Sequence, residues 1–310
     1  MRGVIIRQRG NWYDVMAEGG RVVSCMVKGR FRLEGIRSTS PVVVGDNVEV
    51  EENADGAAFI TRLLPRRNYI LRRASNLSKQ SHILAANIDL CLLLVTMKDP
   101  ETPLTFVDRF LATAEAYSVD VVLVWNKTDL LSEQERARLK EIACVYEKVG
   151  YRCVCGSMLG DEVVSSLAPL IKDKVVLLSG NSGVGKSTLL NLLVPEAKAK
   201  VAPVSVSHHT GMHTTTDTTM YPLPMGGHII DIPGVKGFGT FNFKPEEVSH
   251  YFREIFRVGR DCRFNNCMHL SEPGCAVRDA VDDGEIAQWR YQSYLGMLQD
   301  YDEQKYRPAY

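Results

Sequence analysis

One eight-residue segment constrains the fold of this 310-residue chain more than any other. Residues 180–187 read Gly-Asn-Ser-Gly-Val-Gly-Lys-Ser, a match to G-x-x-x-x-G-K-[ST], in which glycines let backbone N–H groups point at phosphate oxygens. The apolar stretch 174–178 precedes the segment and the helix-forming stretch 188–193 follows it. This context predicts an α/β domain with a phosphate-binding loop between a parallel strand and a helix.

Two side chains of this loop have predicted chemical roles. Lys186 is expected to contact the β- and γ-phosphates as a catalytic residue, and the Ser187 hydroxyl to ligate Mg²⁺. The residues expected to bind the nucleotide phosphates are Gly180, Asn181, Ser182, Gly183, Val184, Gly185, Lys186, Ser187 and Thr188.

A second motif, Asp231-Ile-Pro-Gly234, follows the apolar residues 228–230. An aspartate at the end of a strand is well placed to hold Mg²⁺, and the Gly234 N–H to meet the γ-phosphate. Many GTPases place a water-orienting glutamine directly after such a motif, but this chain has Val235, which cannot polarise water. We therefore expect slow intrinsic hydrolysis, or hydrolysis that uses another residue.

A third motif, Asn126-Lys127-Thr128-Asp129, ends the apolar run 119–125. A carboxylate at Asp129 accepts hydrogen bonds from guanine N1–H and from the exocyclic amine, and adenine has no such donor pair. Asn126 is expected to tie this loop to the phosphate loop, and the Lys127 stem to lie on the base. The motifs together predict GTP rather than ATP as the nucleotide, with the backbone of Gly156 and Ser157 as a weaker candidate contact to guanine.

The order of these motifs is unusual, because the guanine-reading segments precede the phosphate loop. A circular permutation of the usual GTPase sheet accounts for this order and places whatever follows Asp231 close to the switch segments. The polar segment 210–216 has the composition of such a switch. His213 lies in it and is a candidate to orient or deprotonate water. The alternative, a histidine merely hydrogen-bonded in a loop, stays open.

Four residues near the C-terminus, in the pattern Cys-x4-Cys-x-His-x5-Cys, predict a structural metal centre. Cys262, Cys267, His269 and Cys275 fall within 14 residues and form a common tetrahedral zinc set. The alternative is four unrelated residues in a helical core. Eight cysteines in all, in a chain expected to be cytoplasmic, argue against a disulfide framework.

Different patterns flank the central region. Residues 1 to about 70 contain five short strand-like stretches, which fit a small barrel of OB or SH3-like type. Residues 1–75 contain 13 basic and 8 acidic residues, typical either of a nucleic-acid-binding face or of a solvated linker. After residue 240, helices are predicted over 245–256 and 277–304.

These features divide the chain into three predicted domains: a barrel over residues 1–72, a permuted α/β domain over 73–240 and a zinc-binding helical domain over 241–310. The whole chain has 37 basic and 37 acidic residues, so its net charge says nothing about partners. Its apolar runs are too short to span a membrane, so we expect a cytoplasmic protein without membrane contact.

The combined pattern resembles the RsgA (YjeQ) family of circularly permuted GTPases of small ribosomal subunit biogenesis. The resemblance covers nearly the whole chain and includes His-Thr-Thr-Thr at 213–216, Val-Gly-Asp at 44–46 and Arg-Arg-Asn at 66–68. It implies an N-terminal OB-fold and a zinc domain that contact the subunit and its rRNA. It also implies Thr215 as the switch threonine on Mg²⁺ and His213 as the catalytic histidine.

The resemblance implies a monomeric GTPase that turns GTP into GDP and phosphate, faster on the small (30S) subunit during late maturation. Two alternatives remain at this point. One is a GTP-gated RNA-binding switch whose hydrolysis is incidental, which Val235 favours. The other, an ATP-dependent RNA factor, is disfavoured by Asp129.

Overall fold

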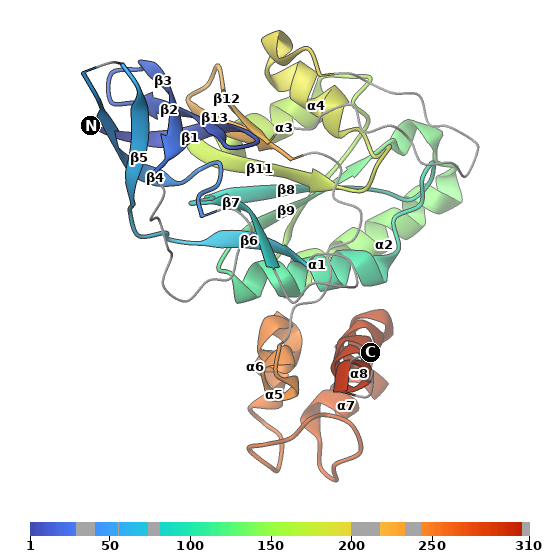
Figure 1. Cartoon of the computed structure of the whole chain (residues 1–310). Helices are drawn as coiled ribbons and strands as arrows, with labels where there is room; N and C mark the ends of the chain where they lie inside the picture. The colour runs from blue at the N-terminus through green and yellow to red at the C-terminus, as the bar shows by residue number, and fades with distance from the viewer. Residues whose placement is uncertain (29–40, 55, 74–80, 200–217, 233–242, 306–310) are drawn as a thin grey trace.

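The computed structural model describes the chain except residues 29–40, 55, 74–80, 200–217, 233–242 and 306–310. Three units follow one another along the chain: an N-terminal barrel, a central sheet wrapped by helices, and a small helical unit beneath helices α1 (Leu104–Ala116) and α2 (Glu133–Val149) (Figure 1). The predicted multi-domain fold, with a barrel, an α/β domain and a helical unit, is confirmed.

The N-terminal barrel is an OB-fold. Its strands are β1 (Arg2–Arg9), β2 (Trp12–Ala17), β3 (Val22–Val27), β4 (Asn47–Glu52) and β5 (Ala58–Leu63). They pair in the order β1-β2-β3-β5-β4, and β1 also pairs with β4, which closes the barrel. The parallel pairing of β3 with β5 is that of an OB-fold rather than of an SH3-like barrel. Ile5, Cys25, Val48 and Ile60 are fully buried inside it.

The central sheet has a parallel core in the order β10-β9-β8-β11-β13. These strands are β8 (Leu90–Thr96), β9 (Val121–Asn126), β10 (Arg152–Cys155), β11 (Lys174–Gly180) and β13 (Gly227–Asp231). Every residue of β8 and β9 is buried, as expected for strands covered on both faces. The covering helices are α1 (Leu104–Ala116), α2 (Glu133–Val149), α3 (Glu162–Ile171) and α4 (Lys186–Leu193). This arrangement places the carboxyl ends of five parallel strands along one edge.

The barrel is continuous with the central sheet, which the sequence does not predict. Strand β12 (Thr219–Pro222) pairs antiparallel with β13 and also with β1, where Arg7 lies opposite Thr219. A separate hairpin, β6 (Tyr69–Arg73) and β7 (Ser81–Ala86), lies at the junction of the two units. The boundary proposed at residue 72 therefore falls inside β6.

Two arginines near the junction of the barrel and the central domain form ion pairs in the structure. Arg66 is buried and makes two 2.6 Å hydrogen bonds to the Asp46 carboxylate. Arg67 pairs with Asp89 at 2.6 Å. These two arginines belong to a run of five between residues 62 and 73 and join the barrel to the central domain. The buried Arg66 is therefore not available to RNA, whereas the side chain of Arg67 is exposed.

The C-terminal unit is helical, with more breaks than predicted. Its helices are α5 (Pro245–Val248), α6 (Arg253–Gly259), α7 (Ala276–Asp282) and α8 (Gln288–Lys305). The single helix predicted over 245–256 is wrong. Helix α5 ends at Val248, a 3-10 turn over Ser249–Tyr251 follows, and Phe252, whose backbone is extended and whose ring is fully buried, precedes the first residue of α6. The helix predicted over 277–304 is interrupted near Gly284, whose φ of 75° is a helix-ending conformation.

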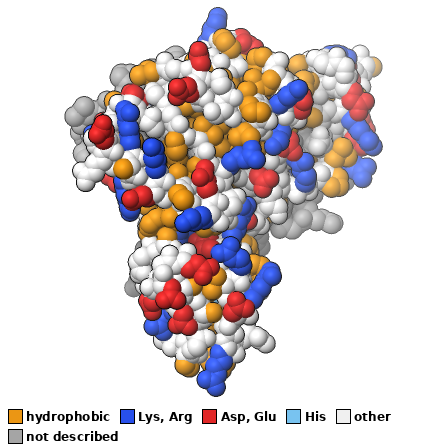
Figure 2. Space-filling view, turned by 180° about the vertical axis from the view of Figure 1, so that it is seen from behind, with side chains coloured by type: hydrophobic (Ala, Val, Ile, Leu, Met, Phe, Trp, Pro, Cys, Tyr) orange, Lys and Arg blue, Asp and Glu red, His pale blue; other side chains and the backbone are white. Residues whose placement is uncertain are grey.

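Figure 2 shows this C-terminal unit as a lobe below the main body, with acidic and basic side chains interspersed over both. None of the helices in the described part of the chain is long and apolar enough to cross a membrane.

Candidate nucleotide site and metal centre

The phosphate-binding segment lies between β11 and α4, as its sequence predicts. Gly180, Gly183 and Gly185 have φ values of 138°, 84° and 107°, a region that favours glycine. Two of them also lack room for a side chain. A Cβ on Gly180 would lie 2.4 Å from the Leu94 carbonyl oxygen, and one on Gly185 would lie 2.4 Å from the Asn126 amide nitrogen. Glycine is therefore required by both conformation and space.

Lys186 is the first residue of α4, and its ammonium lies over the loop. It donates to the carbonyl oxygens of Gly180 at 2.8 Å and Asn181 at 2.6 Å. Burial lowers the pKa of Lys186 to about 8, and the Asp231 carboxylate partly offsets this. An ammonium that is held by carbonyl oxygens, with no carboxylate bonded to it among the described residues, is a candidate to neutralise phosphate charge.

Asp231 ends β13 beside the same loop. Its register partner in β11 is Leu178, two residues before Gly180, so parallel pairing brings the carboxylate to the phosphate edge of the sheet. Burial raises the pKa of Asp231, and Lys186 opposes this rise. Ser187, in the first turn of α4, is half-buried. Carboxylate and hydroxyl oxygens are the ligand types that Mg²⁺ takes, so this edge of the sheet suits a magnesium-bound nucleotide.

Asn126 joins three loops at that edge. Its amide nitrogen donates to the Val184 carbonyl at 2.8 Å, and its amide oxygen accepts from the Met158 N–H at 3.2 Å. The Gly156 N–H donates to the Trp125 carbonyl at 3.0 Å. These bonds fix the 126–129 segment against both the phosphate loop and the 156–157 loop.

The other guanine-reading candidates surround this joint. Lys127 has a left-handed backbone with φ of 62°, and Asp129 is exposed on the short 3-10 turn Thr128–Leu130. Gly156 is buried and Ser157 is half-buried next to them. The Asp129 carboxylate is therefore accessible from solvent at this edge of the sheet.

Four residues of the predicted site lie outside the described residues: His213, Thr215, Gly234 and Val235. The structure therefore neither brings the candidate catalytic histidine and switch threonine to the phosphate loop nor separates them from it. Their roles stay predictions.

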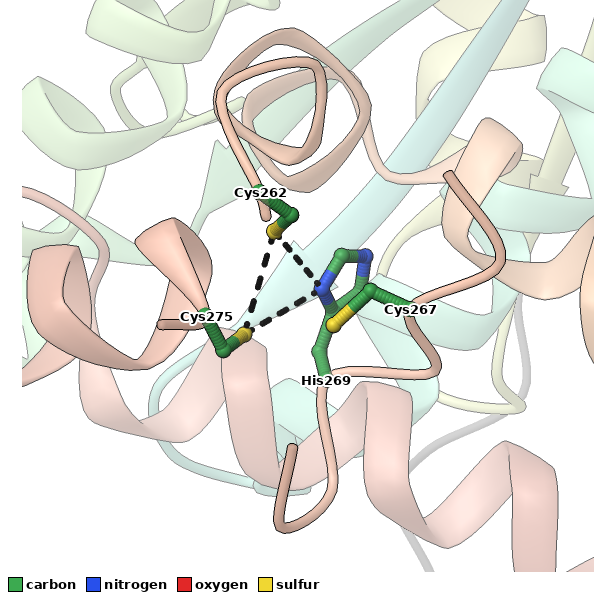
Figure 3. Close-up of side chains that lie close together, drawn as sticks. All are labelled: Cys262, Cys267, His269 and Cys275. Carbon is green, nitrogen blue, oxygen red and sulfur yellow. Dashed lines mark hydrogen bonds between the residues drawn. The ribbon is translucent and has the colours of Figure 1, made fainter. Parts of the chain in front are cut away.

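The predicted metal ligands converge in the C-terminal unit (Figure 3). The ligand atoms of Cys262, Cys267, His269 and Cys275 all lie within 4.8 Å of one another. The His269 Nδ1 lies 3.6 Å from the Cys262 sulfur and 3.4 Å from the Cys275 sulfur, and those two sulfurs are 3.9 Å apart. A tetrahedral zinc with Zn–S of about 2.3 Å and Zn–N of about 2.0 Å needs ligand separations of about 3.5–3.8 Å. The ligand atoms of Cys262, His269 and Cys275 are at about these separations, and the Cys267 sulfur lies within 4.8 Å of the other three, so the cluster is compatible with one tetrahedral ion.

Residues that the sequence motif does not include build the loop around this cluster. The Glu272 carboxylate accepts from the backbone N–H groups of Met268, Leu270 and Ser271 at 2.7–3.0 Å. Tyr291 and Tyr294 of α8 donate to the carbonyls of His269 and Met268, respectively, at 2.6 and 2.7 Å. The spacing of these tyrosines, three apart on one helix face, is the signal that points to a shared role.

A glycine makes room for the histidine ligand. A Cβ on Gly259 would lie 3.2 Å from both Cε1 and Nε2 of the His269 ring. The end of α6 is therefore shaped to accept the imidazole.

Comparisons with known proteins agree with this geometry. Residues 63–241 match the family model described as RsgA GTPase, and residues 2–60 match the RsgA N-terminal domain. The chain belongs to the RsgA GTPase family. It is 53% identical over 310 residues, all of both chains, to the small ribosomal subunit biogenesis GTPase RsgA of Bacteroides fragilis strain YCH46. It is 51% identical over 315 residues, again all of both chains, to the protein of that name from Porphyromonas gingivalis strain W83.

Solved structures extend the likeness to three dimensions. YjeQ from Thermotoga maritima superimposes with a TM-score of 0.76 at 31% identity, over 99% of both chains. YloQ, described as a circularly permuted GTPase, superimposes with a TM-score of 0.75 at 26% identity, over 100% of this chain and 96% of that one. The permuted GTPase fold predicted from the motif order is confirmed, and this RsgA family member is a GTP hydrolase.

Proposed function

We propose that this RsgA family member acts in the biogenesis of the small ribosomal subunit, in the cytoplasm and as a monomer. Its full-length relatives from Bacteroides fragilis and Porphyromonas gingivalis carry that function in their names. In this proposal the protein binds the 30S subunit and its rRNA with GTP, hydrolyses GTP faster there, and leaves with GDP. The observation that supports the proposal most is that the edge of the sheet with the phosphate-binding motif is attached both to an OB barrel and to a helical unit with a Cys3His cluster.

At the nucleotide, the guanine base is read by Asp129, with Lys127 along its face and the Gly156–Ser157 backbone near O6. The glycine loop binds the phosphates, and Lys186 neutralises the β- and γ-oxygens. Ser187, Asp231 and Thr215 hold Mg²⁺, which supplies charge neutralisation for phosphoryl transfer when it is bound. The Gly234 N–H contacts the γ-phosphate.

For hydrolysis, we propose that His213 orients the attacking water, because Val235 cannot. This assignment explains why turnover should depend on a partner. A histidine in a switch segment acts only when that segment is closed over the phosphates, and binding of the subunit is proposed to favour closure.

In the C-terminal unit, we propose one structural Zn²⁺ per chain, held by Cys262, Cys267, His269 and Cys275. With four protein ligands the ion has no open position, so it stabilises the loop 262–275 rather than taking part in chemistry. The OB barrel and this unit are the proposed rRNA contacts. The excess of five basic residues over residues 1–75 supports the barrel's part in binding.

Co-sedimentation with purified 30S subunits tests the proposal. We expect the protein to pellet with subunits in a non-hydrolysable GTP analogue and to remain largely in the supernatant with GDP. Purified 50S subunits serve as the control for non-specific RNA binding. Equal pelleting with both subunits, or none with 30S in any nucleotide, would overturn the proposed partner.

A further inference from the structure

A tightly bonded turn lies between β8 and α1, next to the guanine-reading loop. Thr96 is the last residue of β8, and Thr102 comes two residues before α1 begins. Their exposed fractions are 0% and 4%. The Thr96 N–H donates to the Thr102 hydroxyl oxygen at 3.1 Å, and the Thr102 N–H donates to the Thr96 carbonyl at 2.8 Å. The turn 96–102 is thereby closed at its base.

The tip of this turn contacts Lys127 of the proposed guanine-reading segment. The Thr96 hydroxyl donates to the Pro100 carbonyl, which ties the tip to the base. The next carbonyl back along the chain, that of Asp99, accepts a hydrogen bond from the Lys127 ammonium. Lys127 is thus held by a backbone oxygen, which no side-chain change at position 99 removes.

The turn and the guanine loop also share a strand register. Thr96 lies directly opposite Asn126 in the parallel pairing of β8 with β9. The turn 96–102 and the segment 126–129 therefore leave the sheet at the same strand position. The hydrogen bond from Lys127 to the Asp99 carbonyl joins them a second time beyond the strand ends. The left-handed backbone of Lys127 costs free energy in a non-glycine residue, so the position is fixed by its surroundings.

We propose that the turn 96–102 is a positioning element for guanine recognition, and that Thr102 sets the affinity for the base by fixing the Asp99 carbonyl that holds Lys127. The proposal rests on the guanine-binding role proposed for residues 126–129. Pre-arranging the lysine stem along the face of the base lowers the ordering cost of binding. The proposed role of Thr102 concerns the binding of guanine nucleotides and not the hydrolysis step.

The substitution Thr102→Val tests this, because it keeps the shape and removes the hydroxyl that accepts from Thr96. We expect KM for GTP and Kd for GDP to rise about three- to tenfold, the effect of one lost hydrogen bond, with kcat unchanged. Thr102→Ser, which keeps the hydroxyl, should restore wild-type values. The matched control is Thr113→Val, since the hydroxyl of buried Thr113 on α1 donates within its own helix, to the Arg109 carbonyl at 2.8 Å.

A double-mutant cycle separates positioning from a purely structural role. If Thr102 acts through Lys127, the penalty of Thr102→Val should disappear in a Lys127→Ala background. A penalty of equal size in both backgrounds, or an unchanged Kd in Thr102→Val, would overturn the proposal. Asp129→Asn, measured in parallel, tests the guanine assignment itself: if it leaves base preference unchanged, the proposed site fails, whereas a changed preference with an inert Thr102→Val rejects only the positioning role.

Discussion

Arg290 of α8 and Asp108 of α1 form an ion pair at 2.8 Å in which both side chains are almost fully buried. Arg290 also makes two hydrogen bonds, at 2.6 and 3.0 Å, to the carboxylate of Glu254 in α6. Asp108 accepts further bonds from Ser293 at 2.6 Å and from Tyr146 at 2.8 Å. This network joins the C-terminal unit to the GTPase domain through buried charge.

The network predicts a large stability cost when its cation is removed. Arg290→Leu leaves two carboxylates buried without a counter-charge, and losing one partner of a buried pair costs about 3–5 kcal/mol. We expect the free energy of unfolding, measured by urea denaturation, to fall by that amount. Arg257→Ala is the control, since the Arg257–Glu285 pair is exposed and worth about 0–1 kcal/mol. A cost for Arg290→Leu as small as the control's would contradict the account.

The proposed zinc site predicts how much zinc the native protein contains and which substitution removes it. Native protein should contain about one zinc per chain, and Cys267→Ala should contain close to none, because three ligands hold zinc far less tightly than four. Unfolding of the C-terminal helices should then occur at lower temperature, since ligand binding and folding of such a loop are coupled. Cys144→Ala removes an exposed thiol of α2 and should change neither property. Metal analysis that finds no zinc in native protein would reject the site.

Asp129 predicts the base preference. Asp129→Asn replaces two charge-assisted acceptor bonds with an amide, so GDP affinity should fall roughly 100-fold or more. Xanthosine diphosphate, which carries a carbonyl where guanine has its amine, should bind the variant better than GDP does. Titrating both nucleotides into both proteins measures this. A variant that still prefers guanine would show that another residue reads the base.

Lys186 predicts a pH dependence of binding. Its ordinary pKa is 10.5, and burial lowers the pKa to about 8 in the nucleotide-free protein. Since phosphate attracts the ammonium form, GDP binding should take up a proton above this pH, and affinity should fall by up to about tenfold per pH unit.

The same pKa shift fixes the sign of a stability effect. The burial cost of the Lys186 ammonium is fully present below pH 8 and is relieved as the pH rises from about 8 towards 10.5, so this group's contribution to folding improves with pH. The proton uptake on GDP binding is measured by titration calorimetry of GDP into the protein between pH 7 and 9, in buffers of different ionisation enthalpy. A flat affinity with no proton uptake would show that Lys186 stays charged without nucleotide.

The fold was predictable from sequence where local signals are strong. The glycine loop at 180–187 and the apolar strands around it specify a parallel sheet, and the order of the motifs specifies the permutation. The cysteine and histidine spacing predicts a cluster whose ligand atoms do lie together. Each of these signals depends on residues close in the chain.

The features that were missed depend on contacts between distant residues. Pairing of Arg7 with Thr219 joins two sheets across more than 200 residues, and no local pattern reports it. Arg66 and Arg290 look like ordinary surface cations in the sequence, yet each is buried against carboxylates that lie 20 and 182 residues away. The break at Phe252 was missed for the same reason, because burial of its ring in the C-terminal core, rather than helix propensity, decides the backbone there.

The most direct test of the account is GTP turnover with and without purified 30S subunits, with 50S subunits as the control. We expect slow turnover by the protein alone, because Val235 stands where other GTPases place a glutamine, and a rise of roughly tenfold or more with 30S only. A rate that 30S subunits leave unchanged would contradict the account and would favour a GTP-gated RNA-binding switch whose hydrolysis is incidental.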